Sequence, residues 1–464
     1  MRKAERSPVS RRVAIALCAA IAAFAIGSQA VADEPRAVAV SATPPPAPAS
    51  PTAASINSGD TAWVLMSAAL VLLMTPGLAF FYGGLVRRKN ILSVLMQCFM
   101  VLCVVSVQWV VVGYSLSFGP DKGGIIGGLE WLGLKGVGAA PNADYAATVP
   151  HSAFMLFQMM FAVITPALII GAFAERMRFA AFCVFSALWA TLVYDPVAHW
   201  VWGAGGFLRS WGALDFAGGT VVHVNAGLTA LAAALVLRRR VSFPDGVSPP
   251  HNLPLAVLGA SLLWFGWFGF NAGSALAANG LAANAMVVTH VAAAVAGLTW
   301  ALLDWSFHKK PTTLGMITGT VAGLVAITPA SGFVNATGAL FIGLGAGLLP
   351  WLAVTLLKPR LGYDDTLDAF GVHGVGGAWG AIATGLWATR SVNPAGADGL
   401  FYGNPMQLWV QSKAVVITVA YALVASTILL KLVDVVMTLR VTEHEERVGL
   451  DLTEHREAAY TVID

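Results

Sequence analysis

The sequence predicts an all-α integral membrane protein with eleven transmembrane helices, and three observations lead to this fold class. Of the 464 residues, 57% are hydrophobic and only 11% are charged, whereas a soluble globular protein usually carries about 25% charged residues. The charges stand between long apolar runs or at the ends of the chain. Most of these runs have about 20 residues, the length that a helix needs to cross a bilayer. An ordinary soluble enzyme is therefore excluded, and a net charge of +3 gives no sign of nucleic-acid binding.

The N-terminal 32 residues have the pattern of a secretory signal peptide. Basic residues precede an apolar stretch over 13–26, and Ala30-Val31-Ala32 then supplies the small residues of a cleavage site. Residues 33–58 are rich in Pro, Ala and Ser. We expect them to form a disordered leader because they cannot bury enough apolar surface to fold. A membrane domain is then expected over 59–438 and a cytoplasmic tail over 439–464.

Eleven apolar runs of membrane length follow the leader. The last one is longer than a bilayer requires, so we expect that helix to tilt or to project from the membrane. The predicted spans are 61–82, 91–116, 151–174, 180–200, 217–237, 254–276, 284–306, 312–330, 334–357, 369–390 and 407–438.

The basic residues predict the orientation of these helices. The clusters Arg87-Arg88-Lys89, Arg238-Arg239-Arg240 and Lys309-Lys310 all follow odd-numbered runs. Because Lys and Arg collect on the cytoplasmic side of a membrane, the mature N-terminus is expected outside and the C-terminus in the cytoplasm. The signal peptide independently predicts the same orientation.

Two Gly-rich helices with one histidine each suggest an internal repeat. Residues 218–223 end in His223, and residues 370–377 surround His373. Each segment belongs to the fifth helix of a five-helix block, and an odd number of helices makes the second block enter the membrane from the opposite side. Inverted repeats of this kind place a site near the midplane, between the halves. The long eleventh helix follows the two blocks.

His223 and His373 are the leading candidates for function, because an ionisable residue inside a membrane is costly. Their small neighbours let helices approach closely, so the two imidazoles can meet. A neutral imidazole offers one donor and one acceptor, and a pair can pass on a small hydrogen-bonding molecule or a proton. The alternative is a hydrogen-bonded core group, which we favour for His199 and His290.

Aromatic residues form a second set of candidates. Phe157 and Phe161 are four residues apart on one helix face, as are Phe270 and Ser274, and Trp202 follows the fourth run. Ring faces bind a monovalent cation with about 0.5–2 kcal/mol each, and a serine hydroxyl adds an acceptor. The same stripe is also typical of residues that face lipid or the core.

Acids and cysteines complete the chemical inventory. Asp215 and Asp368 precede the two histidine helices, where a carboxylate can cap free N–H groups or favour a nearby cation. The three cysteines of the membrane runs are interpreted as small core residues. The histidine spacing differs from that of membrane cytochromes, and no third zinc ligand is in reach. We therefore predict neither a metal nor a cofactor, and no enzyme activity.

Five motifs resemble those of the bacterial ammonium transporter family, and the resemblance extends from about residue 57 to the C-terminus. The motifs are FFYGGLVR at 80–87, GAFAERM at 171–177, DFAGGTVVH at 215–223, GWFGFNAGS at 266–274 and DAFGVHGV at 368–375. The resemblance implies a homotrimer in the inner membrane, with one pore in each subunit. It also implies a cytoplasmic tail that couples the subunits and a PII-type nitrogen signal protein as a partner.

The resemblance assigns roles to nine residues. It implies an outer recruitment site for ammonium, or for its analogue methylammonium, and a phenyl gate formed by Phe161 and Phe270. The implied substrate-binding residues are Trp202, Phe157, Phe161, Ser274 and Asp215, and the implied pore residues are His223, His373, Phe270 and Trp267.

The expected mechanism is deprotonation of ammonium near the gate, followed by passage of ammonia along the histidines, with the proton moving separately. Potassium cannot lose a proton, which would explain selectivity. Three other readings stay open: an ammonium sensor that signals through the tail, a gas channel of the Rhesus type, and a membrane enzyme or haem protein. The histidine spacing disfavours the last of these.

Overall fold

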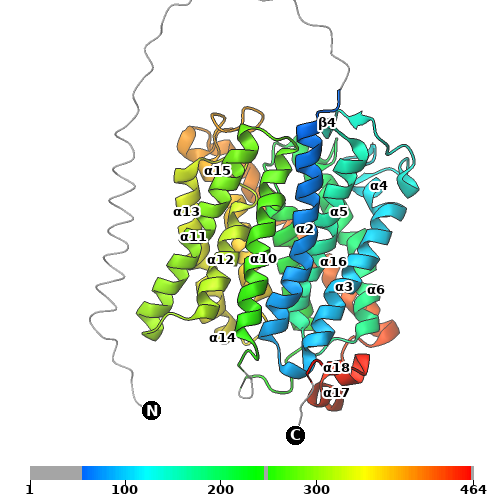
Figure 1. Cartoon of the computed structure of the whole chain (residues 1–464), viewed down its shortest axis with the longest axis vertical. Helices are drawn as coiled ribbons and strands as arrows, with labels where there is room; N and C mark the ends of the chain where they lie inside the picture. The colour runs from blue at the N-terminus through cyan, green and yellow to red at the C-terminus, as the bar shows by residue number, and fades with distance from the viewer. Residues whose placement is uncertain (1–54, 245–248, 461–464) are drawn as a thin grey trace, which may run out of the picture.

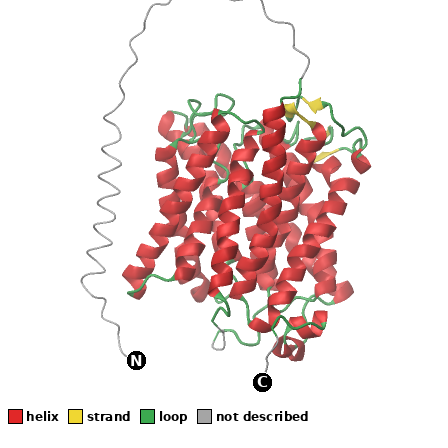
Figure 2. Cartoon of the chain, in the orientation of Figure 1, coloured by secondary structure: helices red, strands yellow, loops and turns green. Residues whose placement is uncertain are grey.

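The computed structural model describes residues 55–244 and 249–460, and within these ranges the chain folds into a bundle of long helices (Figures 1 and 2). The predicted signal peptide and almost all of the predicted leader lie outside the described residues. Short strands lie at one end of the bundle, and the small helices α17 (Glu443–Val448) and α18 (Leu450–His455) lie at the other. We call these the strand end and the tail end.

The helices confirm the predicted all-α membrane fold. Within the described residues, nine helical units are long and apolar enough to cross a membrane, and a shorter apolar helix adds α12. The unit formed by η9 and α15 completes the set, so each of the eleven predicted spans contains a helix. The main helices are α2 (Ser58–Leu85), α3 (Ile91–Gln108), α5 (His151–Phe173), α6 (Phe179–Trp189), α7 (Asp195–Trp202), α9 (Asn225–Leu237), α10 (Leu253–Ala272), α11 (Gly280–His308), α12 (Thr313–Ile327), α13 (Ala336–Leu352), α15 (Gly376–Trp387) and α16 (Pro405–Met437).

Short elements join the long helices. They are α4 (Tyr114–Phe118), α8 (Phe207–Ser210), α14 (Lys358–Leu361) and the helical turns η2 (Arg88–Asn90), η3 (Trp109–Gly113), η4 (Leu132–Leu134), η5 (Ala190–Tyr194), η6 (Gly219–Val224), η7 (Gly273–Ala275), η8 (Ala353–Leu357), η9 (Phe370–Val375) and η10 (Leu400–Tyr402). Strand β1 (Asp121–Lys122) pairs antiparallel with β2 (Ile126–Gly127), and β3 (Pro141–Asn142) pairs antiparallel with β4 (Ala146–Pro150).

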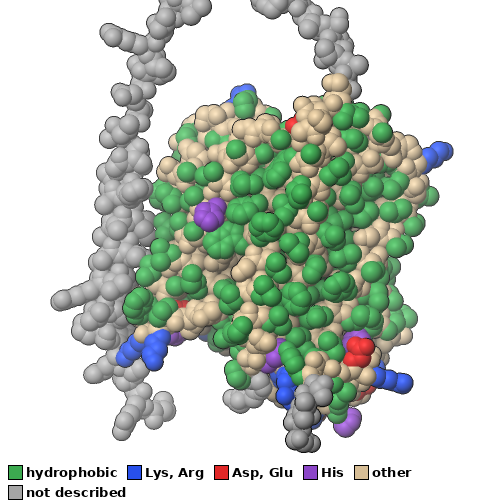
Figure 3. Space-filling view, viewed as in Figure 1, with side chains coloured by type: hydrophobic (Ala, Val, Ile, Leu, Met, Phe, Trp, Pro, Cys, Tyr) green, Lys and Arg blue, Asp and Glu red, His purple; other side chains and the backbone are tan. Residues whose placement is uncertain are grey.

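Polar residues set where several helices begin. Asn252, Asn279, Thr312 and Asn335 each accept a hydrogen bond from a free backbone N–H in the first turn of α10, α11, α12 and α13. Such caps satisfy donors that an apolar helix would otherwise leave unpaired. Between the caps the surface is apolar: in Figure 3, hydrophobic side chains cover the middle of the visible face, and Lys and Arg lie near its ends.

The two five-helix blocks share a proline motif. The sequence Ile-Thr-Pro-Ala occurs at 164–167 in α5 and again at 327–330, at the end of α12. In both copies the threonine hydroxyl donates to the carbonyl four residues earlier, at 2.6 Å for Thr165 and 2.8 Å for Thr328. Each copy lies in the third helix of its block, as an inverted repeat requires.

The two histidine helices cross each other reciprocally. η6 precedes α9 and packs on α15, whereas η9 precedes α15 and packs on α9. A Cβ atom on Gly227 would lie 2.1 Å from the backbone nitrogen of Gly374, so glycine is required at this crossing. Both η6 and η9 are π-helical turns, a form that is common at functional sites.

A buried ion-pair network joins the loops at the tail end. Glu175 accepts hydrogen bonds from Nε of Arg87, from Asn90 and from Arg240, each at 2.9 Å. Arg240 also pairs with Asp364 at 2.8 Å. Burial alone would raise the pKa of Glu175, but the charges of Arg87 and Arg240 hold it below its ordinary value.

The tail is fixed to this end of the bundle. Arg440 and Met177 form an antiparallel β-bridge. Glu446 of α17 accepts hydrogen bonds from Arg440 at 2.8 Å and from the backbone of Val241 at 2.7 Å. The tail therefore packs on the loops that surround the end of the bundle.

Candidate functional site

His223 and His373 lie against each other in the centre of the bundle. Their ring centroids are 5.4 Å apart and the rings are inclined by 18°, and the side chains are 1% and 4% exposed. Close packing brings them together, because a Cβ atom on Gly377 would lie 2.8 Å from Cβ of His223. Within the described residues, both ring nitrogens of His223 and Nδ1 of His373 have no hydrogen-bond partner. They can therefore hydrogen-bond to a molecule that passes between them.

Three cavities lie along the path through these histidines. The outer cavity, named for the predicted orientation, has a volume of about 160 Å³ and is lined by Tyr145, Phe161 and Trp202, among others. The narrow cavity has about 10 Å³ and includes both histidines. The inner cavity has about 430 Å³ and extends from His373 to Glu175. The narrow and inner cavities share His373, so the cavities meet there.

The narrow cavity is apolar apart from the histidines. Its wall is formed by Met74, Leu78, Phe81, Ile164, Leu168, Val222, Leu263, Trp267, Phe270 and Val321. A volume of about 10 Å³ is close to the minimum that holds one water molecule, so a molecule of that size must pass alone. An ion would lose its hydration there without gaining a counter-charge, which is strongly unfavourable.

Trp267 holds one side of the narrow cavity. Its indole N–H donates to the hydroxyl of Thr328 at 2.9 Å, and its ring stacks on His223 with centroids 5.4 Å apart. The Thr328 hydroxyl belongs to the second proline motif. This hydrogen bond fixes the indole, and the indole in turn limits where the His223 ring can lie.

Three of the predicted recruitment residues line the outer cavity together. Phe161 meets Trp202 edge to face, with centroids 5.8 Å apart and an angle of 88°. The Ser274 hydroxyl donates to the carbonyl of Phe270 at 2.8 Å, which leaves its oxygen lone pairs free to accept. The arrangement offers ring faces and one acceptor to a cation with N–H groups.

Phe161 and Phe270 separate the outer cavity from the narrow one. Their ring centroids are 4.3 Å apart and the rings are tilted by 37°. Phe161 lines the outer cavity and Phe270 lines the narrow one. Two aromatic rings therefore close the path between the two cavities, at the place where the sequence predicts a gate.

Two other predicted binding residues are set back from the outer cavity. Phe157 is fully buried and meets Phe161 edge to face at 4.9 Å. Asp215 accepts hydrogen bonds from the backbone of Gly218, Gly219 and Thr220 at 2.6–2.7 Å, and also from the Thr220 hydroxyl. Neither side chain lines the cavity. In this structure they support the residues that do.

Asp215 caps the first histidine helix, but the corresponding prediction for Asp368 is wrong. The second histidine helix is capped by Asp365, which accepts from the backbone of Ala369 at 3.1 Å and of Phe370 at 2.8 Å. Asp368 instead pairs with Lys358 at 2.6 Å. Asp215 and Asp365 each precede their histidine by eight residues, so comparing the two spacings would have identified the right acid.

The two remaining membrane histidines differ from each other. His199 is buried and contacts Asp121 at 2.9 Å and the Ser117 carbonyl at 3.0 Å, as a core group does. The same expectation is wrong for His290, whose side chain is exposed and stacks on Trp264 with centroids 5.3 Å apart. Among the described residues, no group of three His, Cys, Asp or Glu side chains is placed to hold a metal ion.

Known proteins with similar sequences decide the family. The chain matches the family described as the Ammonium Transporter Family over residues 62–460. It belongs to this family. It is 55% identical to the ammonium transporter of Bacillus subtilis over 406 residues, which cover 87% of this chain and 99% of that protein. It is 49% identical to the ammonium transporter Amt1 of Archaeoglobus fulgidus, over 88% of this chain and all of that protein.

Solved structures of ammonium transporter relatives have the same fold. Mep2 of Candida albicans superimposes with a TM-score of 0.80 at 38% identity, covering 84% of this chain and 88% of that one. A structure described as a sensor Amt protein gives a TM-score of 0.79 at 32% identity, covering 86% and 98%. These similarities confirm the predicted family and fold class.

The sequence does not indicate the charged and amide residues that line the outer cavity of this member of the ammonium transporter family. Asp144 and Arg209 stand at its edge, and Gln158 lies one position after Phe157 on α5. Arg209 donates to the Trp202 carbonyl at 2.7 Å. Asp144 lies in the turn between β3 and β4, and Arg209 lies on the short helix α8. Both are outside the apolar runs, where no periodicity indicates which way a side chain points.

Proposed function

We propose that this chain transports ammonium across a bacterial inner membrane, along a path that passes His223 and His373. The observation that carries the proposal is the stacked histidine pair, whose ring nitrogens lack three hydrogen bonds within the described part of the chain and which lies between two wider cavities. Its family is one of transporters rather than enzymes. In the predicted orientation, the strand end faces outward and the tail end faces the cytoplasm.

Ammonium first binds in the outer cavity. Trp202 and Phe161 offer ring faces, and each such contact contributes about 0.5–2 kcal/mol to the binding of a cation. Ser274 accepts one N–H hydrogen bond. Phe157 and Asp215 keep these groups in place, Phe157 by packing behind Phe161 and Asp215 by accepting the Trp202 indole N–H on its backbone carbonyl at 2.8 Å.

The proton leaves before the narrow cavity. A charged molecule between Phe270 and His373 would lie in an apolar space without a counter-ion, and such a charge costs several kcal/mol or more. Neutral ammonia avoids this cost and can donate to or accept from the ring nitrogens. The proton then moves separately along the two imidazoles. Potassium has no proton to lose and is rejected.

The assembly follows from the family resemblance. We propose a homotrimer in the bilayer, with one path in each subunit, and a PII-type nitrogen signal protein that binds at the tail end. The packing of the tail supports the proposal: Glu446 of α17 accepts from the backbone of Val241, and Asp451 and Glu454 of α18 accept from the backbone of Ser93 and Phe179. The regulatory partner would then bind at the same end of the molecule as the inner cavity.

The test is ammonium-elicited current in proteoliposomes of the purified protein, with potassium in a parallel measurement. Wild-type protein is expected to give a current with ammonium alone, and His373→Ala is expected to change it. His290→Ala, which alters an exposed membrane histidine outside the three cavities, serves as the matched control and should leave the current unchanged. If no ion gives a current but labelled methylammonium still enters, transport is neutral and the separate proton path is rejected.

A sensor is the second candidate, because a relative of similar fold is described as a sensor Amt protein. A sensor would bind ammonium in the outer cavity and report it through the tail to a partner. The absence of both current and methylammonium flux in folded protein would put this candidate first. A tail deletion that removes the cellular response but keeps ammonium binding would then support it.

A further inference from the structure

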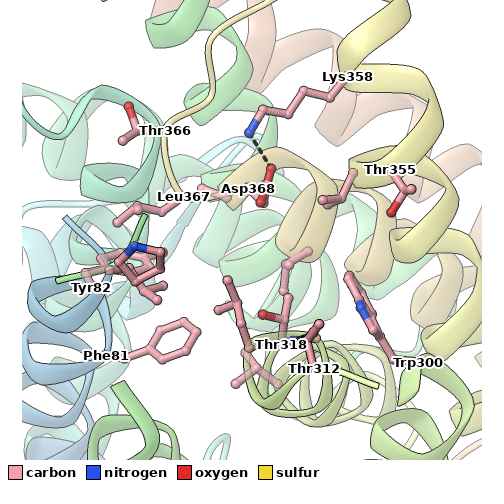
Figure 4. Close-up of a pocket in the computed structure, with 18 of the residues that line it drawn as sticks. Phe81, Tyr82, Trp300, Thr312, Thr318, Thr355, Lys358, Thr366, Leu367 and Asp368 are labelled. Atoms are coloured by element: carbon pink, nitrogen blue, oxygen red, sulfur yellow. Dashed lines mark hydrogen bonds and ion pairs between the residues drawn. The ribbon is translucent and has the colours of Figure 1, made fainter. Parts of the chain in front are cut away.

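The inner cavity contains an ion pair that the proposed transport path does not use. Lys358, at the start of α14, and Asp368, just before η9, meet at 2.6 Å on the wall of the 430 Å³ cavity. Figure 4 shows the Lys358 side chain reaching Asp368, with Phe81, Thr318 and Trp300 on the other side of the space in that view. The pair therefore lies beside the route from His373 to the tail end.

Three carboxylates line this cavity, and two of them are held by fixed groups. Glu175 accepts from Arg87, Asn90 and Arg240. Asp304 accepts from the Trp351 indole and the Thr312 hydroxyl, both at 2.9 Å. These partners sit on helices or in the ion-pair network, so neither carboxylate is available to a mobile cation.

Asp368 differs from the other two. Within the described residues, its side chain is hydrogen-bonded to Lys358 alone, and that partner is the end of a long, flexible chain. The Asp368 carboxylate is 27% exposed and the Lys358 ammonium side chain 17% exposed. Asp368 also has a φ of 61°, a left-handed conformation that is uncommon outside glycine and is found at functional sites.

The partner of Asp368 has the chemistry of the transported ion. The Lys358 side chain ends in a positively charged nitrogen with three N–H donors, and ammonium is the same group with a fourth hydrogen in place of the carbon. We propose that Asp368 is an inner binding residue for ammonium and that Lys358 is its tethered competitor. This inference rests on the proposed transport path through His373.

A tethered competitor weakens the inner site. A group on a short tether has an effective concentration in the millimolar range, so free ammonium must reach a comparable concentration to displace it. Because Lys358 already lines the open cavity in the ion pair, its displacement from Asp368 does not require its charge to enter the apolar core. Ammonium that reforms below His373 would thus be released, while rebinding from the tail end would require a high concentration.

The test compares uptake from the two sides of the membrane. Uptake of labelled methylammonium by inside-out vesicles reports on the inner cavity, and uptake by right-side-out vesicles reports on the outer cavity. For Lys358→Gln, we expect the half-saturating concentration on the inner side to fall by roughly tenfold, because the millimolar tethered competitor is gone. Asp368→Asn is expected to raise it. Half-saturation on the outer side should stay at the wild-type value for both variants.

Two controls separate the possible failures. Lys310→Gln removes an exposed lysine that does not line the cavity and should change neither value. Lys358→Arg keeps the charge and binds carboxylate through two parallel hydrogen bonds, so it should raise the inner half-saturating concentration. If wild-type protein transports in both directions and Lys358→Gln matches Lys310→Gln, the inference is overturned and the transport path stands. Without wild-type uptake in either direction, the transport path itself fails.

Discussion

The outer and inner cavities of this protein are lined by different kinds of side chain. The outer cavity is small, about 160 Å³, and presents the faces of Phe161 and Trp202 with the acceptor of Ser274. The inner cavity is larger, about 430 Å³, and its wall carries the carboxylates of Glu175, Asp304 and Asp368, of which Glu175 and Asp368 are paired with arginine or lysine. Only two tilted rings and the histidine pair separate the two.

The difference indicates how the selection of ammonium in the outer cavity can be separated from its release through the inner cavity. Ring faces attract a cation without holding a counter-charge against it, so the entering ion is bound only weakly in the outer cavity. The ion pairs, by contrast, keep the inner cavity polar, and a carboxylate such as Asp368 can bind a cation on its way out by exchanging its lysine partner for that cation.

The largest effect is expected at the crossing of the two histidine helices, between the outer and inner cavities, where glycine is required. Gly227→Val would place a Cβ atom 2.1 Å from the backbone nitrogen of Gly374, and neither helix can move without displacing a histidine. We expect loss of folded protein or of all uptake, measured by gel filtration in detergent and by methylammonium flux. Gly138→Val, where a Cβ would meet nothing within 4 Å, is the control. Normal uptake by Gly227→Val would show that the crossing is not rigid.

The next largest effect is expected on protein stability, at the buried ion-pair network of the tail end. Glu175→Gln leaves Arg87 and Arg240 without their shared carboxylate, and breaking a buried pair in this way costs about 3–5 kcal/mol. The variant should unfold at a clearly lower temperature in detergent. Exchange of Glu130, which forms an exposed pair with Lys122 at 2.8 Å, for Gln should leave the melting temperature almost unchanged. Equal melting temperatures for both variants would contradict the network's role.

The same glutamate gives a pH dependence with a defined sign. Its pKa in the folded protein lies below its ordinary value, so its stabilising contribution is complete above the unfolded pKa of about 4.3. The contribution is lost as the pH falls through the lower, folded pKa. The difference in melting temperature between wild type and Glu175→Gln should therefore shrink on acidification below about pH 4.

A moderate effect is expected in the outer cavity. Trp202→Leu removes one ring face, and the loss of about 0.5–2 kcal/mol of cation binding corresponds to a rise of roughly two- to thirtyfold in half-saturating ammonium. Uptake by right-side-out vesicles would measure it. Trp409→Leu, which changes an exposed tryptophan outside the cavity, is the control. If half-saturating ammonium is unchanged in Trp202→Leu, the Trp202 ring does not contribute to ammonium binding in the outer cavity.

The smallest effect should come from the edge of the outer cavity. Asp144 is exposed there, and its charge should attract ammonium over a range that salt reduces. Asp144→Asn is expected to raise half-saturating ammonium by roughly twofold in 10 mM salt and to have no effect in 0.5 M salt. A salt-independent change would mean that Asp144 contacts the ion directly.

Composition and periodicity were enough to predict the helices and the central residues. Within the described residues, each of the eleven apolar runs contains a helix, because membrane length and hydropathy leave few other solutions. His223 and His373 were identified because an ionisable group inside an apolar run is costly and rare. Their closeness followed from the glycines around them, which the structure confirms at Gly227 and Gly377.

The errors arose where side-chain direction or a loop partner decides the outcome. Asp368 lies nearer to its histidine helix in sequence than Asp365, but its left-handed backbone turns it toward Lys358. Phe157 shares a helix face with Phe161 and contacts its ring, but it is not among the residues that line the outer cavity; its role in binding stays a prediction. His290 lies in an apolar run as a core residue would, and only the packing of α11 shows that its side chain is exposed. Helix periodicity predicts which helix face a side chain lies on, but it does not predict how deeply the side chain is buried.

The reciprocal crossing of the two histidine helices bears on the speed of transport. Because backbone meets backbone at Gly227 and Gly374, neither half of the molecule can rock against the other without separating atoms already in contact. A carrier that alternates between two shapes has a turnover limited by that rearrangement, whereas a passage of fixed shape is limited by arrival and gating. The crossing therefore favours a flux that rises steeply with supply and depends only weakly on temperature, as in a channel.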